Sequence, residues 1–322
     1  MIYTAPALYF FHDIYGKDEK LQAAIRLAKR AVATDYTVML SGESGTGKDI
    51  VSQAIHLSSM HSSKPYVAIN CGAIPKSLLE SELFGYEAGS FTGAKQSGQA
   101  GKIEQAHRGT LFRDEIAEMP PEMQVALLRV LQDFTVTRIG GTKPIQVDVR
   151  IITATHVDLW KNVQEGKFRA DLFYRLQGVQ VTLPPLRERE DRLDRLELAK
   201  LLLQGIESEL DQGPLALTPS AKRLIERYPW PGNIRQLTAA LREEAFVSEN
   251  RMIAVHSFPE YIRSGYQPMG ERDGAVLPKI NSNDLVDVFL KTGGNVSQTA
   301  RILGIGRNTV YRKLKRMMGD GR

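Results

Sequence analysis

The sequence has little of what marks secreted and membrane proteins. It contains a single cysteine, Cys71, which excludes an internal disulfide, and its six histidines are scattered, so no zinc ligand set is recognisable. No apolar run approaches the length of a membrane-spanning helix. The apolar start, Met1–Phe11, is short and has no basic leader, unlike a signal peptide. These absences favour a cytoplasmic protein without a membrane partner.

The net charge of +5 is concentrated at the end of the chain. Residues 281–322 contain eight Lys or Arg against three Asp or Glu, an excess that equals the net charge of the whole chain. The residues before this segment are therefore neutral overall. A basic excess that is confined to one small terminal segment predicts a polyanion partner for that segment.

The first half of the chain alternates apolar runs with helical patterns. The 322 residues, 42% of them apolar, suffice for two or three compact units. Helical patterns at residues 49–59 and 121–133 lie between four runs that we expect to be buried parallel strands: Tyr36–Leu40, Tyr66–Ile69, Thr110–Phe112 and Val149–Ala154. This alternation predicts an α/β domain with a parallel sheet.

The second half has a different pattern. After Pro184 and Pro185 we find helical patterns only, at residues 195–210, 220–227 and 233–247, which predict a small helical lid. Ser264–Pro278, rich in Gly, Pro and charge, indicates a linker. We therefore expect an α/β sheet domain, a helical lid and a small all-α terminal domain, with segments at 1–12 (extension), 13–185, 186–262, 263–280 (linker) and 281–322.

A glycine-rich motif follows the first apolar run and opens a helical pattern. It has the form G-x-x-x-x-G-K, in which backbone N–H groups surround phosphates and the lysine reaches the terminal phosphates of a nucleotide. Its residues are Gly42, Glu43, Ser44, Gly45, Thr46, Gly47 and Lys48. Asp49 stands where Ser or Thr usually offers a hydroxyl to Mg²⁺, so we expect Asp49 to act on the metal directly or through water.

Two acidic residues, Asp114 and Glu115, end another apolar run. Their spacing from the glycine-rich motif favours a catalytic role over an ordinary solvated surface. We expect Asp114 to hold Mg²⁺ and Glu115 to polarise the water that attacks the terminal phosphate. Arg113 is unexpected here, because a charge within a buried strand is unfavourable unless it lies at the open end of the strand.

The stretch between these motifs is the most specific one. Residues Gly89, Ser90, Phe91, Thr92, Gly93 and Ala94 resemble the GAFTGA loop of sigma-54-dependent activators, also called bacterial enhancer-binding proteins, with Ser90 in place of an alanine. In that family the loop contacts the sigma factor. Its glycines allow the backbone to turn, while Phe91 and Thr92 project. The alternative is an ordinary hairpin with Phe91 in the core.

The resemblance covers about Ile14 to Glu249 and again Asn283 to Arg316. It implies an AAA+ ATPase fold with ATP and Mg²⁺ as ligands. Asn70 matches the switch residue, which hydrogen-bonds the catalytic Glu115. Thr155 matches the first sensor, although the next position holds His156 where the family has asparagine.

Arginines complete the site that the resemblance implies. Arg169 and Arg175 match the arginine-finger segment, which reaches the γ-phosphate in the neighbouring subunit, although arginines on a helix surface are the commoner case. Arg235 matches the second sensor, which contacts the nucleotide from the lid. Gln236 follows it where the family usually has glutamate.

The basic terminal segment contains two helical patterns, Asn295–Ile305 and Arg307–Met317, joined at a short turn. A short turn followed by a basic helix indicates a helix-turn-helix, and the segment resembles the Fis-type module of many family members. We expect contacts with double-stranded enhancer DNA from Arg307, Asn308, Thr309, Arg312, Lys313 and Arg316.

The resemblance implies an activator that forms dimers and hexameric rings and hydrolyses ATP to remodel the closed complex of sigma-54 RNA polymerase holoenzyme into the open complex. One alternative is a DNA-binding regulator whose AAA+ domain only oligomerises or senses a ligand; intact Phe91 and Thr92 argue against it. The other is a DNA-processing motor, which would not need residues 89–94. The activating signal is not visible, so control in trans and a missing upstream domain are both open.

Overall fold

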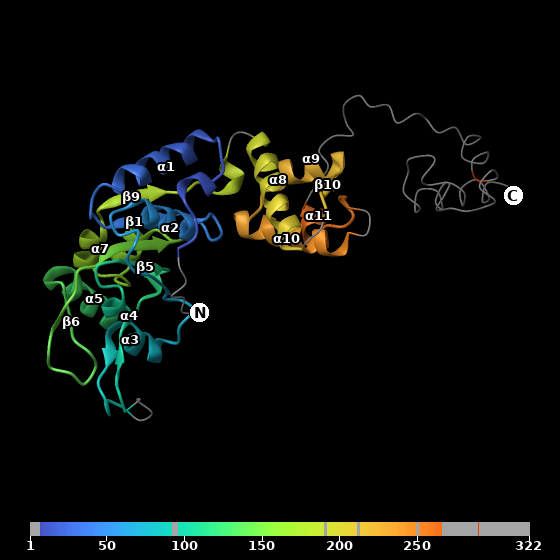
Figure 1. Cartoon of the computed structure of the whole chain (residues 1–322). Helices are drawn as coiled ribbons and strands as arrows, with labels where there is room; N and C mark the ends of the chain where they lie inside the picture. Colours follow the sequence, from blue (N-terminus) through green and yellow to red (C-terminus); the bar gives the residue numbers. More distant parts are fainter. Residues whose placement is uncertain are drawn as a thin grey trace. The chain divides into compact units, whose positions relative to one another are not determined.

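The chain separates into two units, residues 1–266 and 267–322, in the computed structural model (Figure 1). The division lies within the linker expected at 263–280. The expected helix-turn-helix lies outside the described residues except for Phe289. In the first unit the structure describes residues 7–265 apart from 92–95, 190–191, 211–212 and 249–250.

A five-stranded parallel sheet forms the centre of the first unit. In spatial order its strands are β2 (Tyr66–Asn70), β5 (Thr110–Asp114), β8 (Arg150–Thr155), β1 (Val38–Ser41) and β9 (Val179–Thr182). Adjacent strands run parallel, and Val38 pairs with Ile152 on one side and Val179 on the other. The inner strands β5, β8 and β1 are buried along almost their whole length, which explains their continuous apolar sequences.

The sequence predicts four of these strands but not β9. Only Val181 of β9 is buried, and Gln180 and Thr182 are exposed. An edge strand with one face toward solvent lacks the continuous apolar run that identifies the other strands. For this reason β9 was not identified from the sequence.

Helices cover both faces of the sheet. On one face α1 (Glu19–Ala31) and α2 (Lys48–Ser58) share a core with β1, β8 and β9. The other face packs against five helices: α3 (Lys76–Phe84), α4 (Lys102–Gln105), α5 (Pro121–Asp133), α6 (Leu159–Gln164) and α7 (Ala170–Leu176). Short 3-10 turns lie at η1 (Phe11–Asp13), η2 (Ile116–Glu118) and η3 (Leu186–Glu188).

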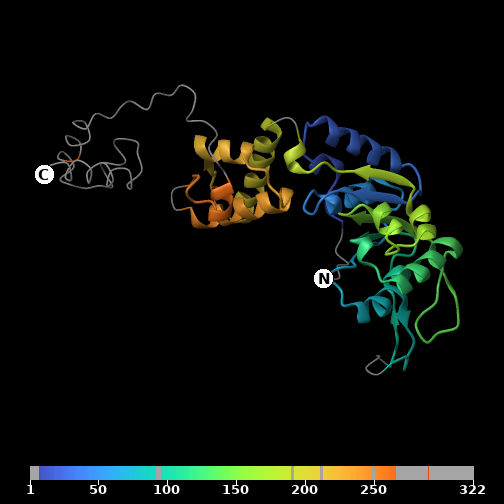
Figure 2. The ribbon, with the colours of Figure 1, turned by 180° about the vertical axis from the view of Figure 1, so that it is seen from behind.

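Two small hairpins lie side by side at one end of this unit (Figure 2). β3 (Gly85–Tyr86) pairs with β4 (Gln99–Ala100), and β6 (Thr135–Val136) pairs with β7 (Ile145–Gln146). The backbone of Ile139 joins them, because its N–H donates to the Gly85 carbonyl (2.9 Å) and its carbonyl accepts from the Glu87 N–H (3.0 Å). The loop of the first hairpin contains residues 89–94.

The lid has a core of its own, with Trp230 and Leu237 fully buried. It consists of α8 (Arg192–Glu209), α9 (Pro219–Arg227), α10 (Asn233–Val247) and α11 (Glu260–Gly265), yellow to orange in Figure 1. The expectation of helices alone was wrong, because β10 (Ala216–Leu217) and β11 (Met252–Ile253) pair in parallel. Strands of two residues are too short to show a period in the sequence. Among the described residues, no helix has the length and apolarity needed to cross a membrane.

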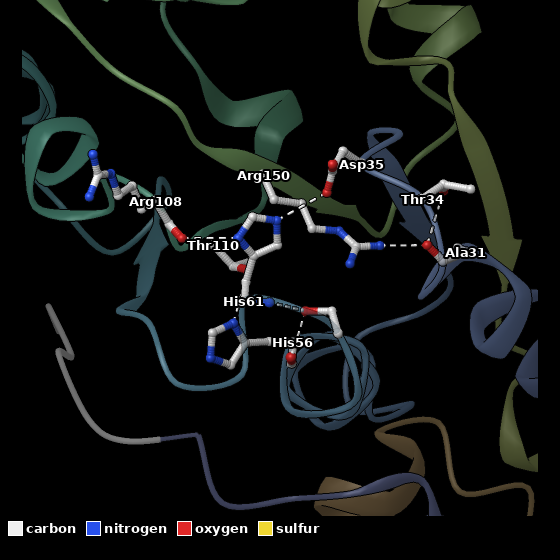
Figure 3. A network of polar contacts seen from close by, with 9 residues as sticks. Ala31, Thr34, Asp35, His56, His61, Arg108, Thr110 and Arg150 are labelled. Atoms are coloured by element: carbon white, nitrogen blue, oxygen red, sulfur yellow. Dashed lines mark hydrogen bonds and ion pairs between the residues drawn. The ribbon is translucent and has the colours of Figure 1, made fainter.

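A partly buried polar network lies at the amino edge of the sheet (Figure 3). His56, at the end of α2, is hydrogen-bonded through Nδ1 to the Thr110 hydroxyl (2.9 Å), and burial lowers its pKa to about 4. His61 contacts the Arg108 carbonyl through Nδ1 (2.9 Å) and an Asp35 oxygen through Nε2 (3.0 Å). Arg150 donates to the carbonyl of Ala31 (2.7 Å) at the end of α1. These contacts join α1, α2, β5 and β8.

Candidate nucleotide site at the carboxyl edge of the sheet

The glycine-rich motif forms the turn between β1 and α2, as the sequence predicts. Gly47 precedes the first residue of α2 with a φ of 94°, and Gly45 has a φ of 77°. Both values lie in the left-handed region that favours glycine. A Cβ at Gly45 would also collide with the carbonyl oxygen of Gly232 in the lid. The motif therefore opens a helix, as a phosphate-binding loop does, while its tip touches the lid.

Lys48 points back over this loop. Its ammonium donates to the carbonyls of Gly42 (2.7 Å) and Glu43 (2.9 Å), and the side chain is buried. Burial lowers the pKa of Lys48, while the carboxylates of Asp114 and other nearby acids act in the opposite direction. The ammonium is thus held by neutral carbonyls beside the acidic groups of the site.

Asp114 and Asn70 lie side by side at the ends of β5 and β2. The strands pair with these residues opposite each other, and the Asn70 amide donates to Asp114 Oδ2 (3.3 Å). We expected Asn70 to bond Glu115, and this structure shows Asp114 as its partner instead, because the strand register aligns these two side chains. The Asn70 side-chain oxygen accepts from the Ala73 N–H (3.0 Å).

Glu115 leaves the strand with a backbone in the left-handed region, at a φ of 54°. Its N–H donates to Asp114 Oδ1 (3.0 Å), which fixes the turn. The carboxylate lies against Gly72, where an added Cβ would collide with Glu115 Oε2. The space that Gly72 leaves is thus a requirement for the position of the Glu115 carboxylate.

Arg113 is the unusual residue of the strand. It is fully buried, and its Nη2 approaches the sulfurs of Cys71 (3.7 Å) and Met119 (3.6 Å). Its other two nitrogens have no partner among the described residues, and burial lowers the pKa of the guanidinium. The Arg113 side chain does not lie at the open end of the strand, where a charge would be tolerated. Its burial is therefore energetically unfavourable, as the sequence indicated.

The donor set at this edge is suited to Mg²⁺. Asp114 ends β5 and Glu115 follows it, while Asp49 follows Lys48 in the first turn of α2, so carboxylate oxygens are available at this edge. Asp49 lies exposed in the first turn of α2. In the described part of the chain no cluster of three His, Cys, Asp or Glu could hold an ion by itself. Mg²⁺ fits such a sparse set, because it prefers oxygen and keeps waters and phosphates as further ligands.

The two predicted sensor residues both contact the phosphate-binding loop. Thr155 ends β8, and its carbonyl accepts from the Gly42 N–H (3.2 Å), while its hydroxyl is bonded to the Val157 backbone. Arg235, in the first turn of α10, donates to the Ser44 hydroxyl (2.7 Å). His156 is exposed and lines a cavity of about 670 Å³ beside the loop, together with Trp160 and Tyr174.

Arg169 precedes α7, Arg175 lies in its last turn, and both are exposed. Arg169 forms an ion pair with Asp171 (2.7 Å), and Arg175 donates to the carbonyl of Leu131 (2.8 Å). These local partners hold the two guanidinium groups at the surface. Their contact with a second subunit stays a prediction.

The loop that carries residues 89–94 is described as far as Phe91. Gly89 lies in the left-handed region, and Ser90 donates to the Ile139 carbonyl (2.9 Å) of the neighbouring hairpin. The Phe91 ring is 43% exposed and meets Tyr86 edge-on at 5.0 Å, so it is not in the core. Outside the described residues lie Thr92, Gly93 and Ala94, and also the predicted DNA contacts Arg307, Asn308, Thr309, Arg312, Lys313 and Arg316.

Sequence reasoning missed two residues that touch the phosphate-binding loop. Arg187 forms a two-point contact with Glu43, and Asn233 bonds to Glu43 and to the carbonyl of Ser44. Arg187 lies in no motif of the nucleotide site, whereas Asn233 lies in the segment that resembles the second sensor, two residues before Arg235, and had no role assigned to it. The only available signal was their place just after the sheet domain and at the start of the predicted helix 233–247.

Comparison with known families matches three consecutive parts of the chain. Residues 14–182 match the sigma-54 interaction domain, residues 187–274 the AAA+ ATPase lid domain, and residues 285–317 the Fis family of bacterial regulatory proteins. The first match lies wholly, and the second as far as residue 266, in the unit that carries the geometry above.

Relatives with known names match nearly the whole chain. The signal-transduction and transcriptional-control protein of Clostridium beijerinckii is 42% identical over 96% of this chain and 49% of its own length. The acetoin dehydrogenase operon transcriptional activator AcoR of Bacillus subtilis is 41% identical over 95% and 51%, and the DNA-binding transcriptional regulator NtrC of Escherichia coli is 40% identical over 95% and 70%. The chain thus spans about half the length of the first two.

A solved structure shares the fold. The crystal structure of NtrX from Brucella abortus in complex with ATP has a TM-score of 0.70 and 32% identity, over 94% of this chain and 69% of that chain. The phosphate-binding loop, the acid pair after β5 and the three family matches lead to one conclusion: the chain belongs to the sigma-54-dependent transcription activators, with an AAA+ domain, an AAA+ lid and a C-terminal Fis-type helix-turn-helix.

Proposed function

We propose that this chain binds enhancer DNA, hydrolyses ATP in a ring of identical subunits and remodels the closed complex of sigma-54 RNA polymerase into the open complex in the cytoplasm. The observation that carries the proposal is the placement of Lys48 after β1 and of Asp114 and Glu115 after β5, at the carboxyl edge of one parallel sheet. The connection from β2 to β5 also contains the hairpin that exposes Phe91. Nucleotide chemistry and the presented loop therefore belong to adjacent segments of one unit.

Each residue of the site has a distinct role in the proposed hydrolysis. Lys48 binds the terminal phosphates, and the backbone N–H groups of the loop surround them. Asp114 and Asp49 would hold Mg²⁺, which would neutralise charge on the phosphates. Glu115 accepts a proton from the attacking water and orients it. Asn70 holds the Asp114 carboxylate.

The remaining nucleotide contacts come from the lid and from a neighbouring subunit. Arg235 contacts the nucleotide from α10, and Thr155 senses the state of the nucleotide from the end of β8. Arg169 and Arg175 extend to the γ-phosphate of the next subunit, where a permanently charged planar guanidinium stabilises developing charge. Hydrolysis then depends on ring assembly.

The hairpin loop transmits the motion that ATP hydrolysis drives to the polymerase. Gly89, Gly93 and Ala94 allow the turn, Ser90 ties its base to Ile139, and Phe91 and Thr92 contact the sigma factor. Through the helix-turn-helix, a dimer binds two half-sites of enhancer DNA. Its phosphate contacts supply a salt-dependent affinity, and a few side chains read base edges.

Transcription in vitro with sigma-54 holoenzyme on a supercoiled template tests the proposal. We expect heparin-resistant open complexes that require both this chain and ATP. Thr92→Ala should keep ATP hydrolysis within a few-fold of the parent and fail to open the promoter, because the contact with the sigma factor is lost. If Thr92→Ala and Phe91→Ala both activate like the parent, a DNA-binding regulator with a merely oligomerising AAA+ domain becomes the better assignment.

A further inference from the structure

The carboxylate of Glu43 is turned toward the lid. Glu43 lies in the phosphate-binding loop, and its two oxygens accept from the two terminal nitrogens of Arg187, with Nη1 2.6 Å from Oε2. This hydrogen-bonded pair lowers the pKa of Glu43 to about 2, so the carboxylate is charged at any physiological pH. A two-point contact between guanidinium and carboxylate fixes direction as well as distance.

Asn233 connects the same loop to the lid from inside. The residue is fully buried at the start of α10, with a φ of 52°. Its amide nitrogen donates to Glu43 Oε2 (3.2 Å) and to the Ser44 carbonyl (3.0 Å), while its oxygen accepts from the Leu186 N–H (2.7 Å). Every hydrogen-bonding group of this side chain thus faces the phosphate-binding loop or the segment that enters the lid.

The backbone of α10 adds a third connection. The Ile234 N–H donates to the Gly45 carbonyl (2.9 Å), and the close approach of Gly232 leaves no room for a side chain at Gly45. On the other side of the loop, the Lys48 ammonium and the Thr46 hydroxyl both donate to the Glu43 carbonyl. Glu43 therefore lies between the lid and the residue that binds phosphate.

We propose that Glu43, Arg187 and Asn233 form a latch between the phosphate-binding loop and the lid, and that Glu43 is a positioning residue of the ATPase reaction. The latch rests on the proposed function. It holds the first turn of α10 against the loop, which keeps Arg235 beside Ser44, and it fixes the carbonyl that Lys48 contacts. Glu43 then acts through Lys48 and Arg235 and does not itself bind nucleotide.

The latch mainly fixes the positions of Lys48 and Arg235 and contributes little to the free energy of unfolding. The side chains of Glu43 and Arg187 are 37% and 40% exposed, and exposed ion pairs contribute little to the free energy of unfolding. Loss of the pair should leave the melting temperature near that of the parent. It should, however, impair nucleotide affinity, because Arg235 loses its fixed position. This contrast separates positioning from a general structural role.

The test is a double-mutant cycle with Glu43→Gln and Arg187→Gln in the full chain. Equilibrium binding of a fluorescent ATP analogue and steady-state hydrolysis are both measured. We expect each single variant to bind about tenfold more weakly, with a raised KM and a smaller fall in kcat, and the double variant to be no worse than either single one. The exchanged pair Glu43→Arg, Arg187→Glu should recover part of the affinity.

Arg242→Gln is the matched control. It removes an ion pair of similar exposure, with Glu209 (2.9 Å), that lies wholly within the lid. This variant should bind and hydrolyse like the parent. If Arg187→Gln behaves like Arg242→Gln while Glu43→Gln is impaired, Glu43 acts on the nucleotide directly and the latch is refuted. Additive losses in the double variant would refute it as well.

These outcomes are independent of the proposed function as a whole. If the parent chain opens promoters but the losses in the double-mutant cycle are additive, only the latch proposal is refuted. If the parent chain binds the analogue and the double-mutant cycle shows coupling, but the chain never opens a promoter, the latch proposal stands and the activator function is refuted.

Discussion

At the carboxyl edge of the sheet, Asp114 and Glu115 are half-buried and Asp49 and Arg235 are exposed, and the glycine-rich loop with Lys48 lies at the same edge. At the amino edge, His56 and Arg150 are 2% exposed and contact a hydroxyl and a carbonyl of the protein itself. Both edges hold polar groups next to an apolar core. The carboxyl edge leaves them accessible to a ligand, whereas the amino edge uses them to join helices and strands.

The comparison predicts that substitutions at the two edges affect different measurements. At the carboxyl edge, activity should fall while the free energy of unfolding changes little. At the amino edge, stability should fall while hydrolysis per folded molecule is preserved.

The largest expected effect is at Glu115 and Lys48. Glu115→Gln should bind ATP and lose about 10²–10⁴-fold in turnover, because the amide cannot take a proton from water. Lys48→Ala should lose binding itself, since no other group here replaces the ammonium at the terminal phosphates. Isothermal titration and a phosphate-release assay separate the two. Near-parental turnover in Glu115→Gln would contradict the assignment.

A pH series tests the amino edge. The pKa of His56 is about 4 in the folded protein and near 6.5 when unfolded. Between these values the unfolded state binds the additional proton, so the stability present above pH 6.5 is lost as the pH falls toward 4. This difference corresponds to about 3 kcal/mol. Urea unfolding at pH 7 and pH 5 should show about 2 kcal/mol of this loss, and His56→Asn, which cannot titrate, should show a smaller loss than the parent.

Two of the buried arginines, Arg113 and Arg150, give opposite expectations. Arg150 donates to the Ala31 carbonyl, so Arg150→Leu should destabilise the fold by about 1–3 kcal/mol. Arg113 has only sulfur partners among the described residues, so Arg113→Leu should stabilise by about 1–4 kcal/mol and leave hydrolysis within a few-fold. The denaturant midpoints of the two variants, compared with that of the parent, test both expectations. A loss of stability in Arg113→Leu, or a gain in Arg150→Leu, would contradict these expectations.

The smallest expected effect concerns Gly72. An added Cβ would displace the Glu115 carboxylate, so Gly72→Ala should reduce turnover by roughly tenfold without changing ATP affinity. Gly205→Ala is the control, because a Cβ there meets nothing within 4 Å and Ala favours the helix. Equal turnover in the two variants would show that Glu115 relaxes without loss.

The sequence predicted those parts of the site that adjoin strands with a strong local pattern. The glycine-rich loop and the acid pair each follow a buried apolar run. Lys48 lies at the start of a helix and Asp114 at the end of a strand, as the sequence predicts. The edge strand β9 lacks such a run. The partner of Asn70 depends on strand register, which the sequence does not display, so Asp114 was not foreseen in that role.

Contacts between distant segments were also out of reach. Glu43 and Arg187 are 144 residues apart in the chain, and nothing in either segment indicates their pairing. The same applies to Ser90, whose hydroxyl finds the Ile139 carbonyl in a separate hairpin. Local pattern identifies chemical groups and strand ends, whereas the packing of the lid and the hairpins selects their partners.

The buried guanidinium of Arg113 gives the active-site strand a dependence on temperature. Hydration of a charged group becomes less favourable as temperature rises, so the cost of removing it from water is greatest in the cold. We therefore expect the stability gained in Arg113→Leu to be largest near freezing and to shrink on heating. The strand that ends in Asp114 therefore carries a larger energetic penalty from this buried charge in the cold than in warm conditions.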